Sequence, residues 1–366
     1  MNGLPATVLM TADAVGGVWS YALGLCAALP EIRFVVAVLG PPPQPAQRVA
    51  AERLANLALA EGRFRLEWMS GGPADVAASR RWLAALAMRH GADLVHVNGF
   101  AQARLDCGVP VVAVGHSDVL SWWRAVHGCA APPEWGAYRG HVVDGLCAAD
   151  RIVVPSHAAL ADLRRQYGLP LTHVAVIANG IDLAAAARRS KRPVVMAAGR
   201  IWDAAKNLVL LDRIAPDLAW PVEIAGDAAH PEQGVVRFRH ARLLGLLNPA
   251  ALRRRLAAAA IFAAPAFYEP FGLTIVEAAA SGCALALGDI ASLRENWDGA
   301  AVFLPPGDGA AWRAGLDRLI ADASERRRLA AAARARAERF ALAESAARYR
   351  ALYCDLHDVA ARRRSA

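Results

Sequence analysis

Residues 268–282 read YEPFGLTIVEAAASG, a turn followed by an apolar run that predicts the start of a buried helix. Gly272 stands in the turn, where the missing side chain lets a ligand approach the backbone. A helix that begins there offers free N–H groups and partial positive charge, which favour a phosphate. Glu269 precedes this helix and Glu277 lies about one and a half turns inside it. The spacing suits a nucleotide-sugar, with a carboxylate near each end and the phosphates between.

The chain of 366 residues is 56% hydrophobic and 20% charged, which predicts two globular domains with ample core. The first basic residue is Arg33, so a charged n-region and a secretory signal are not expected. Six cysteines occur without CxxC spacing, which indicates thiols in a reducing cytoplasm rather than zinc ligands or disulfides.

The net charge is +8, and much of the excess is arginine on helix-like segments. This pattern favours solvated helix faces. An attraction to an anionic acceptor, or a peripheral contact with the anionic inner face of a membrane, remains open. Nucleic acid is not an expected partner, because basic and aromatic residues are not interleaved as in known binding modules.

Short β-branched runs alternate with helical segments rich in Ala, Leu and Arg, among them Val18–Leu29, Ala74–His90 and His157–Tyr167. The alternation predicts a parallel sheet covered on both faces. It restarts after Asn179–Asp182, which predicts two similar domains joined by a linker at 183–192. The expected strands are Thr7–Met10, Arg33–Val38, Leu94–Val97, Val111–Val114, Arg151–Val154, Val174–Ile177, Pro193–Ala198, Val222–Ala225, Val235–Phe238, Ile261–Ala264 and Ala284–Leu287.

Sites in doubly wound folds lie in the loops that follow the carboxyl ends of strands. Gly16 and Gly17 follow the first strand, where they favour either close phosphate approach or an ordinary tight turn. Arg200 and Lys206, in GRIWDAAKN, follow another strand. Two cations there can neutralise a departing diphosphate. Surface charge is the alternative, but we expect this loop and the Glu269 loop to share one sheet edge.

His116 follows VVAVG and, in a polar loop, can donate to a sugar hydroxyl or a phosphate, although most histidines at such positions are structural. His96 lies inside a strand and is expected to be structural. The tandem Trp122–Trp123, with Trp135 nearby, is read as domain core, and an aromatic platform for sugars or lipid tails is the alternative.

Several other chemistries lack their motifs. There is no GxSxG elbow, no GxxxxGK[ST] loop, no HExxH pair and no Asp-x-Asp. A divalent cation on a diphosphate normally needs such acidic oxygen ligands. We therefore expect no metal and no cofactor, with the two cations and the helix N-terminus in place of a metal.

The chain resembles, nearly end to end, the retaining family-4 glycosyltransferases of GT-B fold. The matching motifs are GGV at Gly16, DLVHVNG at Asp93, VGHSD at Val114, VVPSHA at Val153, NGID at Asn179, GR…KN at Gly199, AGD at Ala225 and Glu269-x7-Glu277. The resemblance implies an α/β protein with two Rossmann-like domains whose parallel sheets face a central cleft. Residues 1–180 would bind the acceptor and 181–344 the nucleotide-sugar, and a helix at 345–366 would return to the first domain.

The resemblance also assigns roles. Arg200 and Lys206 would bind the donor diphosphate, and Gly16 and Gly17 would approach it from the other domain. Glu277 would bind the ribose, and His116 would touch the sugar near the reacting centre. The donor sugar would be held by Glu269, Phe271, Gly272 and Leu273, and the nucleobase would lie near Leu246 and Asn248. Lys206 is followed by Asn207, where glycine is frequent in the family. The catalytic set would be Glu269, His116, Arg200 and Lys206.

The sequence thus predicts transfer of a hexosyl unit, with retention, from an NDP-sugar to a glycan, a lipid-linked acceptor or a small molecule. Synthesis of cell-surface polysaccharide or glycoconjugate in the cytoplasm is the expected setting. Two alternatives remain open: a sugar-nucleotide 2-epimerase, which shares the GT-B fold, and a non-catalytic nucleotide-sugar-binding protein.

Overall fold

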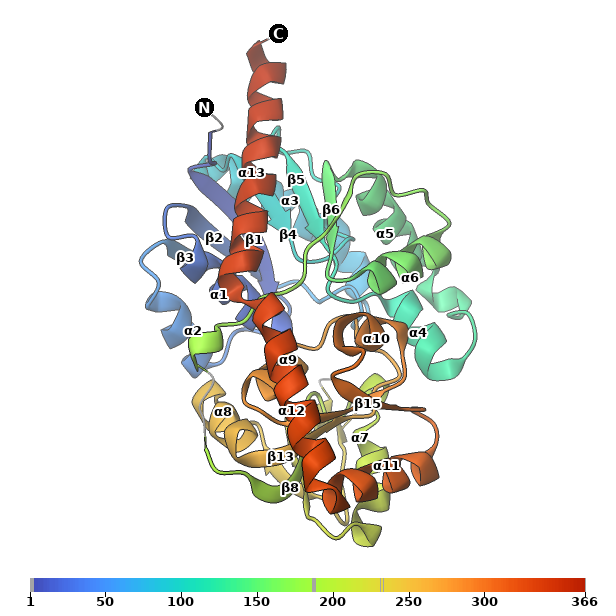
Figure 1. Cartoon of the computed structure of the whole chain (residues 1–366). Helices are drawn as coiled ribbons and strands as arrows, with labels where there is room; N and C mark the ends of the chain where they lie inside the picture. Colours follow the sequence, from blue (N-terminus) through green and yellow to red (C-terminus); the bar gives the residue numbers. More distant parts are fainter. Residues whose placement is uncertain (1–2, 186–188, 231, 233, 366) are drawn as a thin grey trace. The chain divides into compact units, whose positions relative to one another are not determined.

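The computed structural model describes residues 3–185, 189–230, 232 and 234–365, so residues 186–188 of the expected linker lie outside the described part. The chain forms two compact units (Figure 1). Unit 1 comprises Met1–Trp123, Ala130–Gly180 and Leu342–Ala366, and unit 2 comprises Arg124–Cys129 and Ile181–Ala341.

Unit 1 contains a seven-stranded sheet in the order β3-β2-β1-β4-β5-β6-β7. Every neighbouring pair is parallel. The strands are β1 Thr7–Asp13, β2 Arg33–Leu39, β3 Leu57–Glu61, β4 Leu94–Val97, β5 Val111–Val114, β6 Arg151–Val154 and β7 Val174–Val176. The β-branched runs predicted as strands form its centre, because strands buried on both faces need apolar residues at successive positions.

Helices cover both faces of this sheet, and alternate side chains of β1 point to opposite layers. Val8 and Met10 pack with α1 (Gly17–Ala28) and α13 (Leu342–Ser365). Leu9 packs with the layer of α3 (Gly72–His90), α5 (Gly136–Ala148) and α6 (His157–Tyr167). Ser156 caps α6 by accepting from the backbone N–H of Ala159 at 3.1 Å. The remaining helices of this part are α2 Pro45–Glu52 and α4 Val119–His127.

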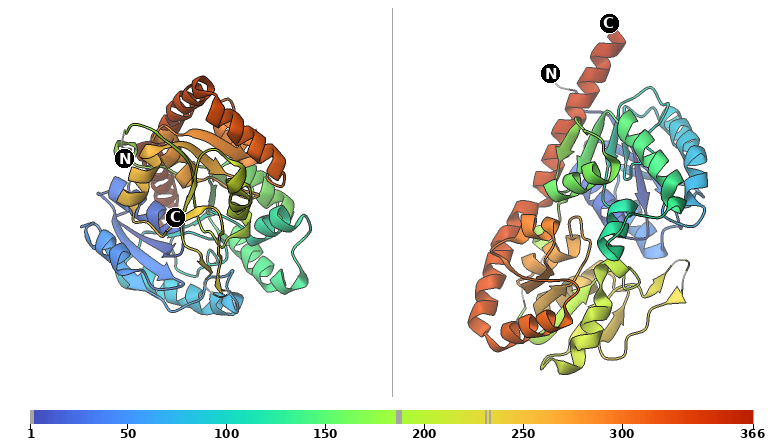
Figure 2. Two further views of the ribbon diagram at one scale, coloured as in Figure 1. Left: turned by 90° about the horizontal axis from the view of Figure 1, so that it is seen from below. Right: turned by 90° about the vertical axis from the view of Figure 1, so that its right-hand side faces the viewer.

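Helix α13 belongs to unit 1 although the sequence of unit 2 precedes it. Its side chains Tyr349, Leu352 and Tyr353 lie in the same core cluster as β1 and α1. Figure 2 shows this long last helix in red. At its far end, the Asp358 carboxylate accepts from the backbone N–H of Gly3 at 2.9 Å, and His357 Nδ1 lies 2.9 Å from the Gly3 carbonyl. Residues far apart in the sequence therefore complete one core.

Unit 2 repeats the same strand order, β12-β9-β8-β13-β14-β15, in a six-stranded parallel sheet. The two doubly wound parallel sheets confirm the predicted fold class. The strands are β8 Arg192–Ala198, β9 Val222–Ala225, β12 Arg242–Gly245, β13 Ala259–Ala264, β14 Ala284–Gly288 and β15 Ala301–Leu304. The helices are α7 Leu208–Ile214, α8 Pro249–Ala258, α9 Leu273–Ala280, α10 Ala291–Trp297, α11 Gly309–Ala321 and α12 Ala323–Ala337. Helices α7 and α11 pack on one face of the sheet, whereas α8 and α9 contact β13.

One predicted strand, Val235–Phe238, is wrong. Its place in the chain holds a small antiparallel pair, β10 (Ala229–His230) with β11 (Gly234–Val235), where Gly234 has a φ of +98°. The sheet position is taken by β12 instead. That edge strand was missed because it is short, largely exposed and begins with arginine. Strands β3 and β15 were missed for related reasons: β3 has a helix-like Leu/Ala composition, and both lie at sheet edges.

The aromatic residues near α4 form a chain of ring contacts. Trp122 and Trp123 lie 6.3 Å apart between ring centroids, and Trp123 lies 6.5 Å from Trp135. Trp135 packs partly buried against the core of unit 1 and meets Tyr138 edge-on. Trp135 thus packs against the core of unit 1, as predicted from the sequence.

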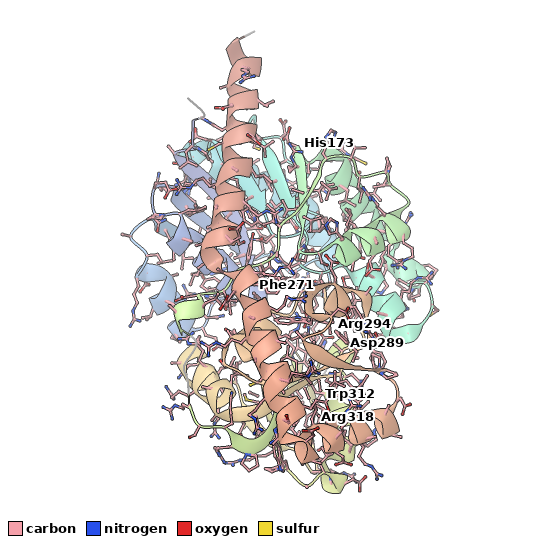
Figure 3. The ribbon with its side chains drawn as sticks, viewed as in Figure 1. His173, Phe271, Asp289, Arg294, Trp312 and Arg318 are labelled. Atoms are coloured by element: carbon pink, nitrogen blue, oxygen red, sulfur yellow. The ribbon has the colours of Figure 1, made fainter. Side chains whose placement is uncertain are left out.

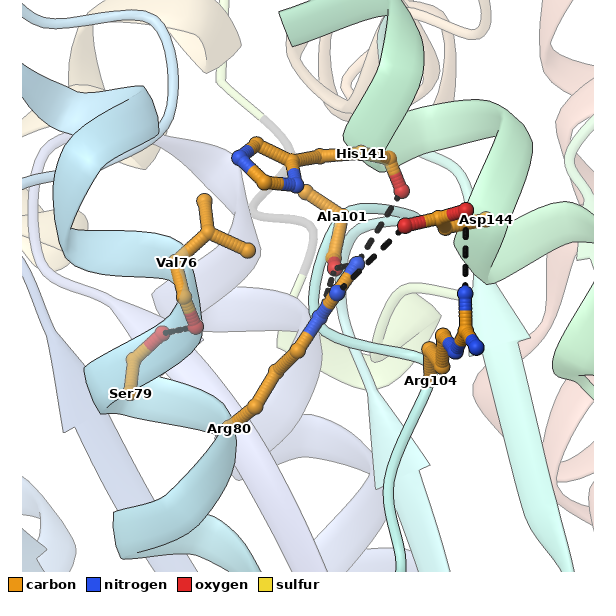
Figure 4. A network of polar contacts seen from close by, with 7 residues as sticks. All are labelled: Val76, Ser79, Arg80, Ala101, Arg104, His141 and Asp144. Carbon is orange, nitrogen blue, oxygen red and sulfur yellow. Dashed lines mark hydrogen bonds and ion pairs between the residues drawn. The ribbon is translucent and has the colours of Figure 1, made fainter. Parts of the chain in front are cut away.

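Arg80 of α3 fastens the loop after β4 to α5 (Figure 4). Its Nε donates to the carbonyl of Ala101 at 2.8 Å, and its Nη2 donates to the carbonyl of His141 at 3.2 Å. Its Nη1 lies 3.7 Å from a carboxylate oxygen of Asp144, which Arg104 also contacts at 3.2 Å. The Arg80 side chain is 14% exposed and that of Arg104 is 64% exposed.

We therefore expect Arg80→Ala to lower the free energy of unfolding by about 2 kcal/mol, because buried carbonyls lose their donors. Arg104→Ala, the matched control on the same carboxylate, should cost less than about 0.5 kcal/mol, as exposed pairs do. Urea denaturation followed by tryptophan fluorescence measures both changes. Equal losses in the two variants would contradict this account.

Candidate functional site

The strand order of unit 2 reverses between β8 and β13, and ligands of doubly wound folds bind at that point, beyond the carboxyl ends of the strands. The segment that follows β8 contains Arg200 and Lys206. The segment that follows β13 contains Glu269 and leads into α9. Since β8 and β13 are parallel neighbours, both predicted segments lie at the same sheet edge.

The two segments are joined by direct hydrogen bonds. The backbone N–H of Phe267 donates to the carbonyl of Ala205 at 2.8 Å. The side-chain amide of Asn207 donates to the carbonyls of Pro265 at 3.1 Å and Pro306 at 2.7 Å. Asn207 has a φ of +53°, the left-handed conformation that glycine and asparagine tolerate best. Asn207 thus adopts the left-handed backbone conformation at a position where glycine is frequent in the family that the sequence resembles. Its side chain adds two hydrogen bonds that glycine could not make.

Lys206 and Glu269 meet at this edge. Lys206 ends a short 3-10 helix, Ala204–Lys206, whose first turn is capped by the Asp203 carboxylate. Its Nζ lies 2.6 Å from Oε2 of Glu269, and the two side chains are only 20% and 18% exposed. The hydroxyl of Ser292 donates to the carbonyl of Glu269 at 2.7 Å and fixes its backbone. Lys206 is one of only two lysines in the sequence, the other being Lys191.

Arg200 is held within its own loop. Its Nη2 lies 2.7 Å from a carboxylate oxygen of Asp203, whose side chain is 4% exposed. The guanidinium carbon also lies 5.2 Å from the ring centroid of Trp202. Arg200 therefore lies at the expected sheet edge, and its contacts with Asp203 and Trp202 orient its guanidinium group.

Helix α9 begins at Leu273, with Gly272 as its N-cap residue. Gly272 has a φ of +87°, and a Cβ there would lie 2.7 Å from the Ile275 side chain, so the turn requires glycine. Phe271, which is labelled in Figure 3, is buried. Its ring packs edge-on against Phe340, with 5.3 Å between the ring centroids, and this contact anchors the turn. The free N–H groups at this helix start thus sit on a rigid support.

The remaining predicted donor residues of unit 2 lie on α9 and around β12. Glu277 is partly buried in α9; burial raises the pKa of its carboxyl, and the charge of Arg253 opposes that shift. Leu246 directly follows β12 and is 61% exposed. Asn248 caps α8, because its side chain accepts from the backbone N–H of Ala251 at 2.9 Å.

Gly226 sets the position of the Arg200 loop. It has a φ of +146°, and a Cβ on it would lie 1.8 Å from the carbonyl oxygen of Gly199. The backbone N–H of Gly199 donates to the Ala225 carbonyl at 3.0 Å, and that of Ile201 donates to the Asp227 carbonyl at 2.8 Å. The AGD motif is therefore the platform on which the loop after β8 rests.

In unit 1 the corresponding edge carries the other predicted residues. Gly16 is the N-cap residue of α1, which begins at Gly17. His116 follows β5; its Nε2 lies 2.8 Å from Oδ1 of Asn98, and its ring meets Tyr21 edge-on at 4.5 Å. Burial lowers the pKa of His116 to about 4. His96 is fully buried, which agrees with its predicted structural role.

Three polar residues lie in the predicted site loops, but no role of their own was predicted for them: Asn98, Asp203 and Asn207. Each acts through a partner that the sequence does not reveal, or through a backbone conformation. Asn207 had a signal, since asparagine replaces glycine in the GR…KN motif.

Within the described residues, no group of three or more His, Cys, Asp or Glu side chains is arranged to hold a metal ion. In the same described part of the chain, no helix combines the length and the apolar character needed to cross a membrane.

Two family models match the chain: Glycosyltransferase Family 4 at residues 15–185, and Glycosyl transferases group 1 at residues 192–322. Among curated proteins, it is 29% identical over 275 residues to a D-inositol 3-phosphate glycosyltransferase of Xylanimonas cellulosilytica, covering 65% of this chain and 64% of that protein. It is 27% identical over 271 residues to a glycogen synthase of Mycobacterium tuberculosis, covering 67% of this chain and 64% of that protein. The match thus spans slightly less than two thirds of these relatives' length.

Solved structures share the fold. A sucrose-phosphate synthase from Thermosynechococcus elongatus superposes with a TM-score of 0.78 at 16% identity, covering 96% of this chain and 99% of that one. Anabaena HepE in complex with UDP and glucose superposes with a TM-score of 0.75 at 18% identity, covering 96% of this chain and 100% of that one.

Proposed function

Since this chain is a family-4-like glycosyltransferase of GT-B fold, we propose that it transfers a hexosyl unit, with retention, from a nucleoside-diphosphate sugar to a hydroxyl-bearing acceptor. The observation that carries this proposal is the Lys206–Glu269 pair, held at the switch point of unit 2 beside the start of α9. A cation, a carboxylate and a helix N-terminus are the groups that a sugar diphosphate needs.

The ion pair explains how the charged side chains of Lys206 and Glu269 can both lie at a largely buried site when no substrate is bound. A buried charge without a partner is costly, so each group neutralises the other in the free protein. When the donor binds, its diphosphate would take over the ammonium of Lys206. The Glu269 carboxylate would then accept hydrogen bonds from sugar hydroxyls. Arg200 would turn from Asp203 to the same diphosphate.

Negative charge grows on the diphosphate as the glycosidic bond breaks. Fixed donors aimed at that charge are the main source of catalysis in such a site. Lys206, Arg200 and the N–H groups at the start of α9 would supply these donors without a metal ion. Glu277 would hold the ribose, and Leu246 would contact the nucleobase. Anabaena HepE was solved with UDP and glucose, and the other two similar proteins are a sucrose-phosphate synthase and a D-inositol 3-phosphate glycosyltransferase. For this chain we propose UDP-sugars as the first donors to test, because HepE was solved with UDP.

The test has two arms. UDP-, GDP-, ADP- and dTDP-sugars are first compared for thermal stabilisation, where a ligand at 100 times its Kd contributes about 2.7 kcal/mol. The reaction of the stabilising donor with candidate acceptors is then followed by NMR, with and without EDTA. Retained anomeric configuration in a new glycoside supports the proposal. Inversion at C2 of the donor sugar would indicate an epimerase. Binding of the donor without turnover under any of these conditions would indicate a binding protein.

The presence of only two lysines permits a direct test of the donor site. We expect saturating nucleoside diphosphate to slow the acetylation of Lys206 at least several-fold, because the phosphates cover its ammonium. Lys191 should react at an unchanged rate, since its Nζ donates to the Ser281 carbonyl at 2.8 Å elsewhere in unit 2. Mass spectrometry of the two peptides reads both rates in one sample. Equal protection of both lysines would speak against a diphosphate at Lys206.

A further inference from the structure

A continuous line of hydrogen bonds connects the last helix of the chain to His116. The hydroxyl of Tyr353, on α13, lies 2.6 Å from Nδ1 of His96. Nε2 of His96 lies 3.0 Å from Oδ1 of Asn98, and Nε2 of His116 lies 2.8 Å from the same oxygen. Tyr353 and His96 are fully buried. All four residues belong to unit 1.

Thr11 fixes the direction of the Asn98 amide. The Asn98 side-chain nitrogen lies 2.6 Å from the carbonyl oxygen of Thr11, and a carbonyl can only accept. The backbone N–H of Asn98 also donates to Oγ1 of Thr11, at 2.7 Å. A flipped amide would place two oxygens against each other, so Oδ1 must point toward the two histidines.

The direction of the amide determines both imidazole tautomers. An amide oxygen only accepts, so His96 and His116 must each present a protonated Nε2 to it. Burial lowers the pKa of His96 to about 3 and that of His116 to about 4, so both rings are neutral near pH 7. A neutral ring with a proton on Nε2 carries a lone pair on Nδ1. His96 uses that lone pair to accept from the hydroxyl of Tyr353.

We propose that Asn98 presents His116 to the substrate as a hydrogen-bond acceptor, through Nδ1, for a sugar hydroxyl. His96 and Tyr353 act as positioning residues, because His96 shares the Asn98 oxygen with His116 and the Tyr353 hydroxyl holds the His96 ring through Nδ1. The sequence had indicated His116 as a donor; the amide reverses that role. This inference rests on the proposed transferase function, since it assigns the ligand chemistry of one residue of that site.

Long-range proton–nitrogen NMR of the full chain, labelled with 15N at its ten histidines, tests the arrangement without any substrate. His116→Gln assigns the signal. We expect a neutral ring at pH 7 with the proton on Nε2 for both His96 and His116. A proton on Nδ1 of His116, or a charged ring, would overturn the proposal. The donor-site test at Lys206 would be unaffected, so the two failures can be told apart.

Matched substitutions on α13 test the positioning roles of Tyr353 and His96. Tyr353→Phe should leave the proton of His96 on Nε2, because Asn98 still accepts there, but it should shift the Nδ1 resonance of His96, whose lone pair loses its donor. It should also lower kcat about tenfold at nearly unchanged donor KM, because the ring that shares the Asn98 oxygen with His116 is less firmly placed. Tyr349→Phe is the control. It removes a fully buried hydroxyl from the same helix and the same ring cluster, but among the described residues it is Tyr353, not Tyr349, whose hydroxyl bonds to His96. It should leave the His96 signal in place.

Asn98→Leu removes the shared acceptor and should lower kcat on the order of 10²-fold, with a mixture of tautomers at His116. Should this variant fail to fold, the native spectrum and the tyrosine pair still decide the proposal. An unchanged His96 Nδ1 resonance and an unchanged kcat in Tyr353→Phe would remove the two positioning residues from it.

Discussion

Replacing Lys206 by alanine should lower kcat/KM for sugar transfer on the order of 10²-fold or more, as removal of one donor to a developing charge does. Two effects act in the same direction. The diphosphate loses its cation, and the partly buried carboxylate of Glu269 loses its partner and repels the incoming phosphates. Kinetics with the donor chosen by thermal stabilisation measures the loss.

A double-mutant cycle separates these effects. If Lys206 serves only to neutralise Glu269, then Lys206→Ala/Glu269→Gln should recover much of the activity. If Lys206 also binds the diphosphate, relief of the repulsion can restore only a small part of the activity, and the double variant should stay far below the native kcat/KM. Lys206→Arg, which keeps the charge on a different shape, should recover part of the activity. Lys191→Ala provides the lysine control and should stay within about threefold of the native kcat/KM below its own melting temperature. Full activity in Lys206→Ala would overturn the proposed site.

Gly226→Ala should be the most damaging substitution by a single methyl group in unit 2. The new Cβ would meet the Gly199 carbonyl oxygen at 1.8 Å, and the φ of +146° is strained for alanine. Overpacking and backbone strain of this kind cost about 3 kcal/mol together. The loop after β8 must shift to relieve the contact, so donor binding should weaken along with stability.

Gly199→Ala is the matched control for stability. It adds a methyl group to the other member of the same backbone contact, yet its Cβ would lie 3.7 Å from the Lys206 side chain, an ordinary van der Waals distance. We expect its unfolding free energy to change by less than about 1 kcal/mol. Urea denaturation of the two variants compares them directly. A Gly226→Ala protein as stable as Gly199→Ala would show that the loop does not rest on this platform.

The central strands were predictable because burial on both faces leaves few polar residues in them. Val111–Val114 and Arg151–Val154 were placed with the bounds that the structure has. Edge strands such as β12 escape such reasoning, since one side of an edge strand is not paired and tolerates arginine. The loops after β8 and β13 were placed at one edge by the topology rule alone. The 2.6 Å contact of Lys206 with Glu269 was not readable, because 63 residues separate them.

The roles of Asn98 and Gly226 were out of reach for a different reason. The motifs DLVHVNG and AGD could be recognised in the sequence. However, Asn98 and Gly226 within them act by contacting backbone carbonyls, those of Thr11 and Gly199. A carbonyl belongs to every residue, so no side-chain pattern marks it. Physical reading of a sequence finds charges and periodicity more readily than it finds which backbone atom a side chain will meet.

The membership of α13 in unit 1 has a consequence for the order of events on the ribosome. Tyr349, Leu352 and Tyr353 fill the core beside β1, so that core stays open until residues 342–365 have been made. Residues 181–341 carry the whole six-stranded sheet in one uninterrupted stretch. The later-synthesised unit can therefore reach its native state first, while the earlier one waits, partly assembled, for its final helix.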